Sequence, residues 1–561
     1  MKAYTLIVLL ALFGLGPGVF GKSSVPQAVP TFDCIGLRWA PKEGASDVVC
    51  SVRYREKGTS EWREALPLWF DDYVHEEAPQ YRDEYRGSIV GLRDGTRYEV
   101  ELSLESGLAR ERIEVETWSS DFKIARVVTL PERLEETLTI REGGNPKDGY
   151  VLYQASEGGT VIDGRNRDDA NVRVEANFVI LRGLTLVGAA RHGVHLGKVQ
   201  NVVVEDCDIS GWGQDLDDGW GRNFDSAIFH ETKDGEEKTL QRIVIQNNRM
   251  HHPRSNSNSW MQARESRNGS RHPIGPQAIS FINGEGEIVI RHNRIYSDWD
   301  HMFNDAMGEW HNFGYGGFPV RDSDIYGNWV SHCWDDGLEI EGANLNVRVW
   351  GNVIDSTFGA IATAGTSVGP CYIFRNIYLR SRKGPDSYRG QFFLKLGGEP
   401  RSEPYAQGRI YVFHNTILQP EPWEGTSESS GAQAGLKLST GKKVQVNIQS
   451  RNNILWLRHD TGHAIYDGQL SERNDFNYDL YNGKVLGHES SQSEGIVGVP
   501  VFAEPLREGA GWALPLAEDS PGFGEAVVLP NFNDDYSGEG PDMGAIESGK
   551  PLPDFFPASD S

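Results

Sequence analysis

The chain has 561 residues, more than one ordinary globular core holds, although a solenoid of stacked repeats can absorb several hundred residues as one unit. It carries 80 acidic and 55 basic side chains, and the net charge of -25 opposes binding to nucleic acid and to anionic membrane surfaces. A polyanionic partner would therefore need a local basic patch.

The first residues are typical of a secretory signal peptide. Lys2 precedes an apolar run over residues 6–15, and small residues suited to a signal peptidase follow, ending at Gly21. We expect residues 1–21 to be removed and the protein to be secreted or periplasmic. The apolar run is too short for a stable membrane anchor and no other segment has 18 apolar residues, so no membrane span is predicted.

Residues 22–122 alternate apolar and polar side chains in short runs separated by turn signals, as in a small β-sandwich. Trp39 lies on one of these runs, and residues 92–98 read Leu-Arg-Asp-Gly-Thr-Arg-Tyr. These features resemble the fibronectin type III family: Trp39 stands where that family buries its core tryptophan, and Asp94 is in place of the proline in that family's corner motif. The resemblance implies a spacer or docking module.

The chain has five cysteines, an odd number, and their spacing matches no metal-binding module. Cys34 and Cys50 fall on adjacent predicted strands, so they either form a disulfide or remain thiols. Cys207 and Cys333 lie in the repeat region and are expected to be buried thiols.

Residues 123–500 contain a recurring asparagine, placed after a short apolar strand and before another apolar pair. Two successive spacings are 24 residues, and the wider ones are consistent with the same unit carrying an insertion. This period predicts a solenoid whose coils stack over one core. Because Asn tolerates left-handed backbone geometry and can hydrogen-bond from coil to coil, we predict a parallel β-helix with Asn at a repeated corner. The asparagines are Asn248, Asn293, Asn328, Asn352, Asn376, Asn415 and either Asn452 or Asn453.

These coils, with Asp-Asp-Gly-x-Glu at 335–339, resemble the parallel β-helix of secreted pectinases, polysaccharide lyases and related carbohydrate-active proteins. The resemblance implies an all-β protein in which a right-handed parallel β-helix follows the sandwich, and an activity on carbohydrate. The Asn-Thr-Asp and Gly-His-Gly motifs of pectin-cleaving hydrolases are missing, which argues against a pectin substrate. Residues 501–561 are similar to the closing segment of such helices and are expected to cap the last coil.

Aligning the coils on their asparagines places one strand of each coil in a single column, and the large insertions enter beside it. They should wall one cleft, where aromatic rings stack on sugars and polar groups bind hydroxyls. Alternatively, the insertions merely cover the coil surface. The candidate substrate-binding residues are Asn304, Asp305, His301, Trp334, His332, Lys395, Trp310, His311, Trp260 and His230.

The column contains an acidic cluster at 334–342. Since alternate residues of a strand share a face, Leu338 and Ile340 can fill the core while Glu339 and Glu341 point outward into solvent, roughly 6.6 Å apart. By their offset from the Asn corner, Asp300 should align with Asp335 and Asn304 with Glu339. Crowded carboxyls raise at least one pKa, so an acid and a base can coexist at neutral pH. The candidate catalytic residues are Glu339, Glu341, Asp336, Asp335 and Asp300.

Three functions fit these residues. The leading hypothesis is a glycoside hydrolase that acts on a polysaccharide with inversion, since Glu339 and Glu341 approximate the roughly 6.5–9.5 Å carboxyl separation of inverting enzymes. It requires no cofactor, and a monomer is expected. The second is a lyase that acts on a uronic acid, with Lys395 or an arginine as base and Ca²⁺ neutralising the uronate. The third is a glycan-binding adhesin without catalysis. The alternative Ca²⁺ ligands are Asp335, Asp336, Glu339 and Glu341.

Overall fold

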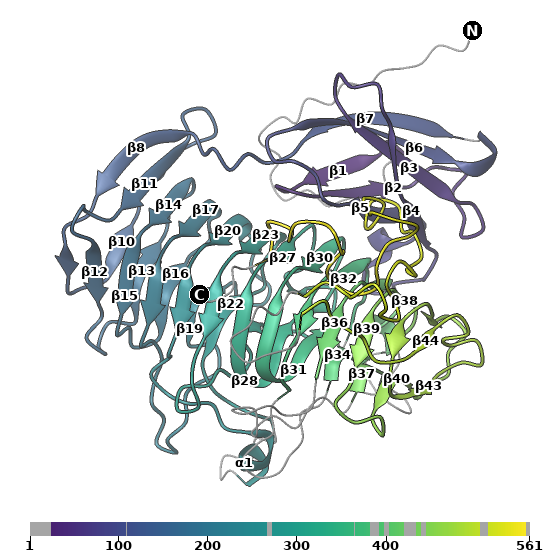
Figure 1. Ribbon diagram of the computed structural model, residues 1–561. Helices are drawn as coiled ribbons and strands as arrows, with labels where there is room; N and C mark the ends of the chain where they lie inside the picture. The colour runs from purple at the N-terminus through teal and green to yellow at the C-terminus, as the bar shows by residue number, and fades with distance from the viewer. Residues whose placement is uncertain are drawn as a thin grey trace.

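The computed structural model shows a small sandwich followed by a long helix of parallel strands (Figure 1). The segment 1–21, predicted to be a signal peptide, lies outside the described residues. The structure describes residues 24–107, 109–265, 272–363, 365–381, 392–397, 403–419, 434–438, 445–504 and 514–556.

The sandwich consists of seven antiparallel strands in the order β1-β2-β5-β4-β3-β6-β7. β4 pairs with both β5 and β3 and so joins the two layers. Trp39 is 2% exposed and lies in the core between them, as predicted. The elements are β1 (Gln27–Pro30), β2 (Ile35–Trp39), β3 (Cys50–Glu56), β4 (Arg63–Asp71), η1 (Pro79–Tyr81), β5 (Glu84–Ile89), β6 (Arg97–Leu104), η2 (Glu105–Gly107) and β7 (Arg110–Glu116).

The cysteines are all free and buried. Cys50 packs in the sandwich core, whereas Cys34 belongs to a different apolar cluster between the sandwich and the β-helix. The disulfide alternative for this pair is therefore wrong. Cys207 and Cys333 are buried thiols, as predicted.

The larger part of the chain is a right-handed parallel β-helix, which confirms the predicted all-β fold. Its first sheet has twelve parallel strands, and branched side chains stack in register along its inner face, for example Ile290, Ile325 and Val349. The strands of the first sheet are β8 (Ile124–Thr129), β11 (Tyr150–Gln154), β14 (Val179–Arg182), β17 (Gln200–Glu205), β20 (Gln241–Gln246), β23 (Gly286–Arg291), β27 (Asp324–Tyr326), β30 (Val347–Trp350), β32 (Cys371–Phe374), β35 (Ile410–Phe413), β38 (Ile448–Arg451) and β41 (Asp475–Phe476).

The second sheet bends at a corner. Each coil contributes one strand before the bend, the corner strand, and one after it, the column strand. In two coils a single long strand, β28 or β31, occupies both positions. The corner strands are β9 (Arg133–Leu134), β12 (Thr160–Asp163), β15 (Leu184–Val187), β18 (Asp208–Ser210), β21 (Arg249–His251), β24 (Arg294–Tyr296), β28 (Trp329–Glu339), β31 (Val353–Thr363), β33 (Ile377–Tyr378), β36 (Thr416–Leu418), β39 (Ile454–Trp456), β42 (Leu480–Tyr481) and β44 (Ile496–Val497). The column strands are β10 (Leu138–Ile140), β13 (Ala170–Val174), β16 (His192–Leu196), β19 (Ser226–Glu231), β22 (Gln277–Ile282), β25 (Met307–Gly308), β34 (Phe392–Leu396), β37 (Ala434–Leu438), β40 (His463–Asp467) and β43 (Lys484–Leu486).

The insertions add a few short elements. A two-stranded antiparallel ribbon joins β26 (Gly317–Phe318) to β29 (Glu341–Gly342). The helix α1 (Trp260–Glu265) lies beyond the column edge of the coils in Figure 1, and η3 is Glu403–Tyr405. No helix among the described residues is long and apolar enough to cross a membrane.

The recurring asparagines form a buried ladder. Each amide group from Asn248 to Asn453 donates to the side-chain oxygen of the next rung, at 2.9–3.0 Å, and the last rung is Asp479 at 2.7 Å. The ladder member of the final Asn pair is Asn453. The prediction that the ladder residue itself adopts left-handed geometry is wrong: the residue before it does so, as Arg375 (φ 53°) and Asn452 (φ 62°) show. The preceding residue makes the turn and leaves the Asn side chain free to face inward.

Residues 514–556 run back from the last coils toward the sandwich, as the yellow trace in Figure 1 shows. Leu516 and Met543 pack against Ile454 and Leu480 near the end of the helix. Between Leu516 and Met543 in sequence, Phe532 stacks on Tyr372 of the first sheet, with ring centroids 5.7 Å apart.

The sandwich lies on the outer face of the first sheet. Tyr326 donates its hydroxyl to Asp33 of the sandwich, and the backbone N–H of Ser88 donates to the Tyr372 hydroxyl at 3.0 Å. These contacts connect two parts of the chain that are far apart in sequence, so the sandwich is fixed against the coils.

Candidate functional site

The acidic cluster lies on the outer face of the column, where β28 continues into β29. Leu338 and Ile340 are buried in the helix core, and Glu339 and Glu341 lie on the opposite face, as strand alternation predicted. Glu339 stands in register with Ala362 on β31, and Ala362 with Lys395 on β34. The column therefore lines up acidic and basic groups coil by coil.

The two glutamates are not exposed to solvent, contrary to expectation. Glu339 is 8% exposed and Glu341 is 3% exposed. Residues 309–320, which we call the covering loop, close over them: β26 pairs with β29, and the Asn312 amide donates to Glu339 Oε1 at 3.0 Å. An insertion that folds over its own neighbouring strand cannot be foreseen from strand alternation.

Three aspartates form the tightest group. Asp305, Asp335 and Asp336 each place one carboxyl oxygen within 4.8 Å of the other two, and all three are buried. The backbone N–H of Asp336 donates to Asp305 Oδ1 at 2.9 Å. This spacing is shorter than the roughly 6.5–9.5 Å of an inverting pair. The inverting prediction, which rested on Glu339 and Glu341, therefore does not carry over to the aspartates.

The predicted alignment of the preceding coil is wrong by four residues. The backbone N–H of Asp335 donates to Asn304 O at 3.0 Å, so Asn304 lies beside Asp335 rather than beside Glu339. A turn around residues 297–301, closed by Ser297 Oγ to His301 O at 2.6 Å, takes up the additional length. Asp300 lies in this turn, exposed and outside the cluster.

Asp335 is held by two side chains from the insertion 251–275. The indole N–H of Trp260, at the start of α1, donates to Asp335 Oδ1 at 3.1 Å, and His272 Nε2 lies 3.1 Å from Oδ2. Burial by itself raises the pKa of Asp335, but the hydrogen bond and charge of His272 hold it below its usual range. In turn, desolvation opposes protonation of His272, but the carboxylate outweighs it and raises the pKa of His272 to about 9.

Asp336 is paired with Lys395. The ammonium group lies 2.8 Å from Asp336 Oδ2 and 3.5 Å from Glu341 Oε1. Desolvation would lower the pKa of Lys395, but the charges of Asp336 and Glu341 raise it well above its usual value. Lys395 therefore stays protonated. Gly359 makes room for this arrangement, because a Cβ there would lie 2.3 Å from Asp336 Oδ1.

Three other carboxyls resist ionisation. Burial, then the charge of Asp335, raises the pKa of Asp305 well above its usual value, and the same two causes raise the pKa of Asp336 to about 7 against the pull of Lys395. Burial and the charges of Asp305 and Glu341 raise the pKa of Glu339. The group thus holds an ionised carboxylate and protonated carboxyls together near neutral pH.

Two predicted substrate-binding histidines lie away from the cluster. His230 is fully buried, stands in register with the core residue Phe281, and hydrogen-bonds Leu196 O at 3.0 Å. Alternation on β19 points it inward, so it cannot meet a substrate. His301 contacts Pro253 O at 2.8 Å in the same turn as Asp300.

The other predicted binding residues lie on several elements. Trp334 is buried with its ring 5.7 Å from Trp299, and His332 lies 3.0 Å from the Ser331 hydroxyl. In the covering loop, Trp310 is 56% exposed and packs beside His311, which pairs with Glu309 at 2.8 Å.

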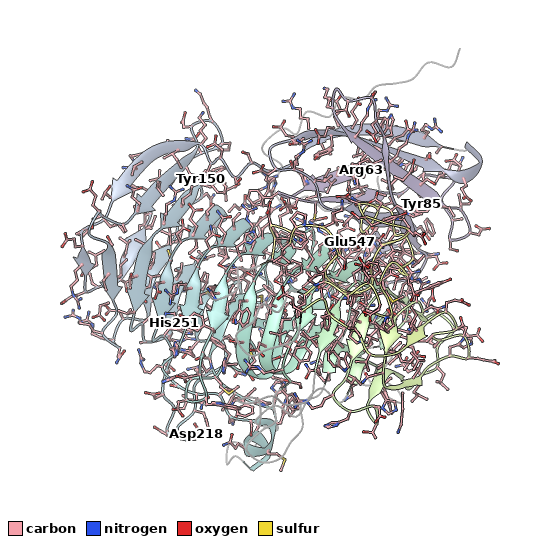
Figure 2. The ribbon with its side chains drawn as sticks, viewed as in Figure 1. Arg63, Tyr85, Tyr150, Asp218, His251 and Glu547 are labelled. Atoms are coloured by element: carbon pink, nitrogen blue, oxygen red, sulfur yellow. The ribbon has the colours of Figure 1, made fainter. Side chains whose placement is uncertain are left out.

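Beneath the loops, Asn304 is buried, and its Oδ1 has no hydrogen-bond partner among the residues that the structure describes. The two insertions before the column contact one another through the Gly221 N–H and Asn256 O at 2.9 Å, and Figure 2 places Asp218 of the first one at the edge where α1 lies. Aromatic and polar groups therefore surround the acidic cluster.

The four predicted Ca²⁺ ligands are only partly brought together: Asp335 and Asp336 lie with Asp305 in a group of carboxyl oxygens close enough to share a cation. Of the four expected ligands, Glu339 and Glu341 are absent from the close oxygen group found among the described residues. Of the remaining two, Asp336 Oδ2 is paired with the Lys395 ammonium and Asp335 Oδ2 with the protonated His272 ring. These two cations supply the positive charge that a metal would bring.

Sequence reasoning missed two residues that hold the cluster, His272 and Asn312. Each is a single polar residue inside a long insertion, with no periodic neighbour to mark it. Their insertions had been expected to wall the site, and that placement was the available signal.

Comparisons with known proteins give fold-level likeness. The chain matches no protein-family model and no curated protein. Among solved structures it is similar to the Dettilon tailspike protein (15% identity, TM-score 0.31), covering 63% of this chain and 61% of the tailspike's length. It is similar to the catalytic domain of a GH87 α-1,3-glucanase in complex with nigerose (9% identity, TM-score 0.35, 83% and 90% covered). A pectate lyase from Erwinia chrysanthemi in complex with tetragalacturonic acid matches at 10% identity and a TM-score of 0.13, with 72% and 86% covered.

Proposed function

We propose that the protein is a polysaccharide-degrading glycoside hydrolase whose catalytic acid and nucleophile belong to the clustered aspartates Asp305, Asp335 and Asp336. The observation that carries the proposal is their close, buried grouping with opposed pKa shifts: Asp335 is held ionised, whereas Asp305 and Asp336 are pushed toward the protonated form. Glycosidic hydrolysis needs this combination, a protonated carboxyl beside an ionised one.

The roles follow from the partners of each group. Asp336, with a pKa of about 7, gives its proton to the glycosidic oxygen as the C–O bond breaks. The nearby Lys395 ammonium then stabilises the carboxylate that remains. At the short separation of the aspartates, which is typical of retaining enzymes, Asp335 attacks the anomeric carbon and forms a glycosyl-enzyme; Asp336 then takes a proton from the water whose oxygen displaces Asp335 from that carbon. Trp260 and His272 keep Asp335 oriented for this step.

In this proposal Glu339 and Glu341, predicted as the acid–base pair, have a supporting role. The charge of Glu341 helps to keep Asp336 and Glu339 protonated, and the covering loop buries both glutamates. Trp310, the exposed indole of the covering loop, offers a flat apolar face for a sugar ring.

Hydrolysis has better support than elimination. The lyase hypothesis needs Lys395 or an arginine to take a proton, but the raised pKa of Lys395 keeps that group charged. Arg380 is paired with Asp355. A non-catalytic adhesin gains nothing from a cluster of buried carboxyls, which costs folding free energy. Secretion, predicted from residues 1–21, fits an enzyme that acts on extracellular polysaccharide.

A polysaccharide panel tests the reaction class. The purified protein is incubated with neutral and acidic polysaccharides, with and without a chelator, while reducing ends and ultraviolet absorbance are followed together. We expect new reducing ends without absorbance, unchanged by the chelator. Absorbance of an unsaturated product would show elimination, and loss of activity with the chelator would show that a metal is required.

The leaving group of the substrate distinguishes the role of Asp336, the acid, from that of Asp335. Asp336→Asn should lose about 10²–10⁴-fold in kcat on polysaccharide, but much less on an aryl glycoside whose leaving group needs no proton. Asp335→Asn should lose activity on both substrates. The control is Asp300→Asn, which alters an exposed carboxyl in the neighbouring turn. Equal losses for Asp336→Asn on both substrates would contradict the assigned acid role.

A further inference from the structure

The covering loop contacts the acidic cluster on one side. Asn312 donates to Glu339, and β26 pairs with Glu341 and Gly342. The pairing is so close that a Cβ on Gly317 would lie 2.0 Å from Glu341 O. Gly317, at a φ of 89°, therefore lets the loop lie directly on the strand that carries the glutamates.

On its other side the same loop contacts the sandwich. Tyr315 lies in the covering loop, and its hydroxyl is 3.3 Å from Nδ1 of His75, which belongs to the sandwich. The Tyr315 ring meets the His75 ring edge-on at 5.5 Å and stacks on Tyr81 at 6.5 Å. Tyr315 and Tyr81 both pack against a small apolar cluster formed by Ala343, Leu345 and Val368.

The sandwich side of this contact is rigidly held. His75 is fully buried, and its Nε2 lies 2.8 Å from Asp71 Oδ2. Arg86, also fully buried, pairs with Asp71 and donates to Val368 O of the β-helix at 2.8 Å. Burial raises the pKa of Asp71, but the charge of Arg86 and the hydrogen bond of His75 outweigh it and hold that pKa below its usual range.

The ionised Asp71 sets the direction of the hydrogen bonds. The carboxylate accepts from His75 Nε2–H, so Nδ1 is the ring atom that meets the Tyr315 hydroxyl; this tautomer is assigned from the network. Burial raises the pKa of Tyr315, so its phenol keeps a proton to donate to Nδ1. The contacts thus form a chain from Asp71 through His75 and Tyr315 to the loop that binds Glu339.

We propose that the N-terminal sandwich is part of the active site, with His75 and Tyr315 as positioning residues that hold the covering loop closed over the acidic cluster. This differs from the spacer or docking role implied by the resemblance of the sandwich. The inference rests on the proposed function for its catalytic consequence, but the mechanical coupling between sandwich and loop does not depend on that function.

The consequence is electrostatic. Burial is the first cause of the raised pKa values of Glu339 and Asp336. A loosened loop admits water, which stabilises the ionised forms and lowers these pKa values. The proposed acid must be protonated to act, so activity falls as pH rises through its pKa. A lower pKa would move this fall in activity, the alkaline limb of the pH profile, to a lower pH. A purely structural contact would change stability without moving that alkaline limb.

The test uses two matched tyrosines in the full chain. Tyr315→Phe removes the hydroxyl that meets His75 and keeps the ring, whereas Tyr372→Phe removes a hydroxyl that also joins sandwich to helix but lies on β32, away from the loop. Hydrogen exchange of residues 309–320 is measured by mass spectrometry, together with kcat and KM across pH. We expect Tyr315→Phe to speed exchange of the loop about five- to tenfold, as loss of one buried hydrogen bond implies.

In kinetics, Tyr315→Phe should lower kcat and move the alkaline limb to lower pH, while Tyr372→Phe changes neither the loop exchange nor the limb. Tyr315→Ala, which also removes the ring contacts, should enlarge both effects. Loop exchange identical in wild type, Tyr315→Phe and Tyr315→Ala would overturn the inference. Faster exchange in a protein that cleaves no polysaccharide would keep the coupling and reject the proposed function.

Discussion

The coils carry two buried rows of polar side chains, and the rows are built in opposite ways. In the asparagine ladder every amide donates to the next rung and accepts from the one before, so each rung satisfies its neighbours. In the acidic cluster, carboxyls crowd together, and Asp336 Oδ1 has no hydrogen-bond partner among the described residues. A satisfied row stabilises a fold, whereas a buried row with unmet charge costs stability and marks a site of chemistry.

Substituting one residue in each row should give the largest and most different effects on stability and activity. Asn352→Ala removes the acceptor shared by the Asn328 side-chain amide and backbone N–H, and leaves that backbone N–H buried and unmet. We expect the free energy of unfolding to fall by about 2–4 kcal/mol with kcat unchanged below the melting temperature. Denaturant unfolding and kinetics measure the two quantities. Asn145→Ala, at an exposed turn, is the control and should cost little.

Asp336→Asn should behave in the reverse way, losing activity but not stability. The neutral amide removes a like charge from a crowded site, so the melting temperature at pH 7 should stay level or rise. A variant that lost both activity and several kcal/mol would place Asp336 with the structural row, against the account.

Stability should also depend on pH in a way that Asp336 controls. Its pKa is raised from 3.8 to about 7 on folding, so the native state binds the proton more tightly than the unfolded chain. The stability that this proton contributes to the folded state is fully present below pH 3.8 and is lost as pH rises toward 7. The melting temperature of wild type should therefore gain, relative to Asp336→Asn, as pH falls from about 7 to about 5. Parallel pH curves for the two proteins would contradict the raised pKa.

The smallest expected effect concerns the covering loop. Trp310→Ala should raise KM about three- to tenfold with little change in kcat, because a stacking face is lost while the carboxyls remain. Trp62→Ala, which removes an indole of the sandwich beneath Arg53, is the matched control. An unchanged KM for Trp310→Ala would remove this indole from the substrate path.

The two rows also differ in how far the sequence reveals them. The ladder repeats at a fixed spacing, so local pattern was enough to find its rungs and to predict the parallel β-helix. Alternation likewise placed Glu339 and Leu338 on opposite faces. The register of Asp300 failed because a turn in one coil shifted the alignment by four residues. Burial of Glu339 and the partnership of His272 with Asp335 depend on how long insertions fold over the column, and no periodic signal encodes that.

Catalysis by the clustered aspartates is the central claim, and the rate of reducing-end release at pH 7 by wild type, Asp336→Asn and Asp300→Asn tests it most directly. We expect a loss of at least about 100-fold for Asp336→Asn and wild-type rates for Asp300→Asn, with both variants folded. Wild-type rates in folded Asp336→Asn would contradict it.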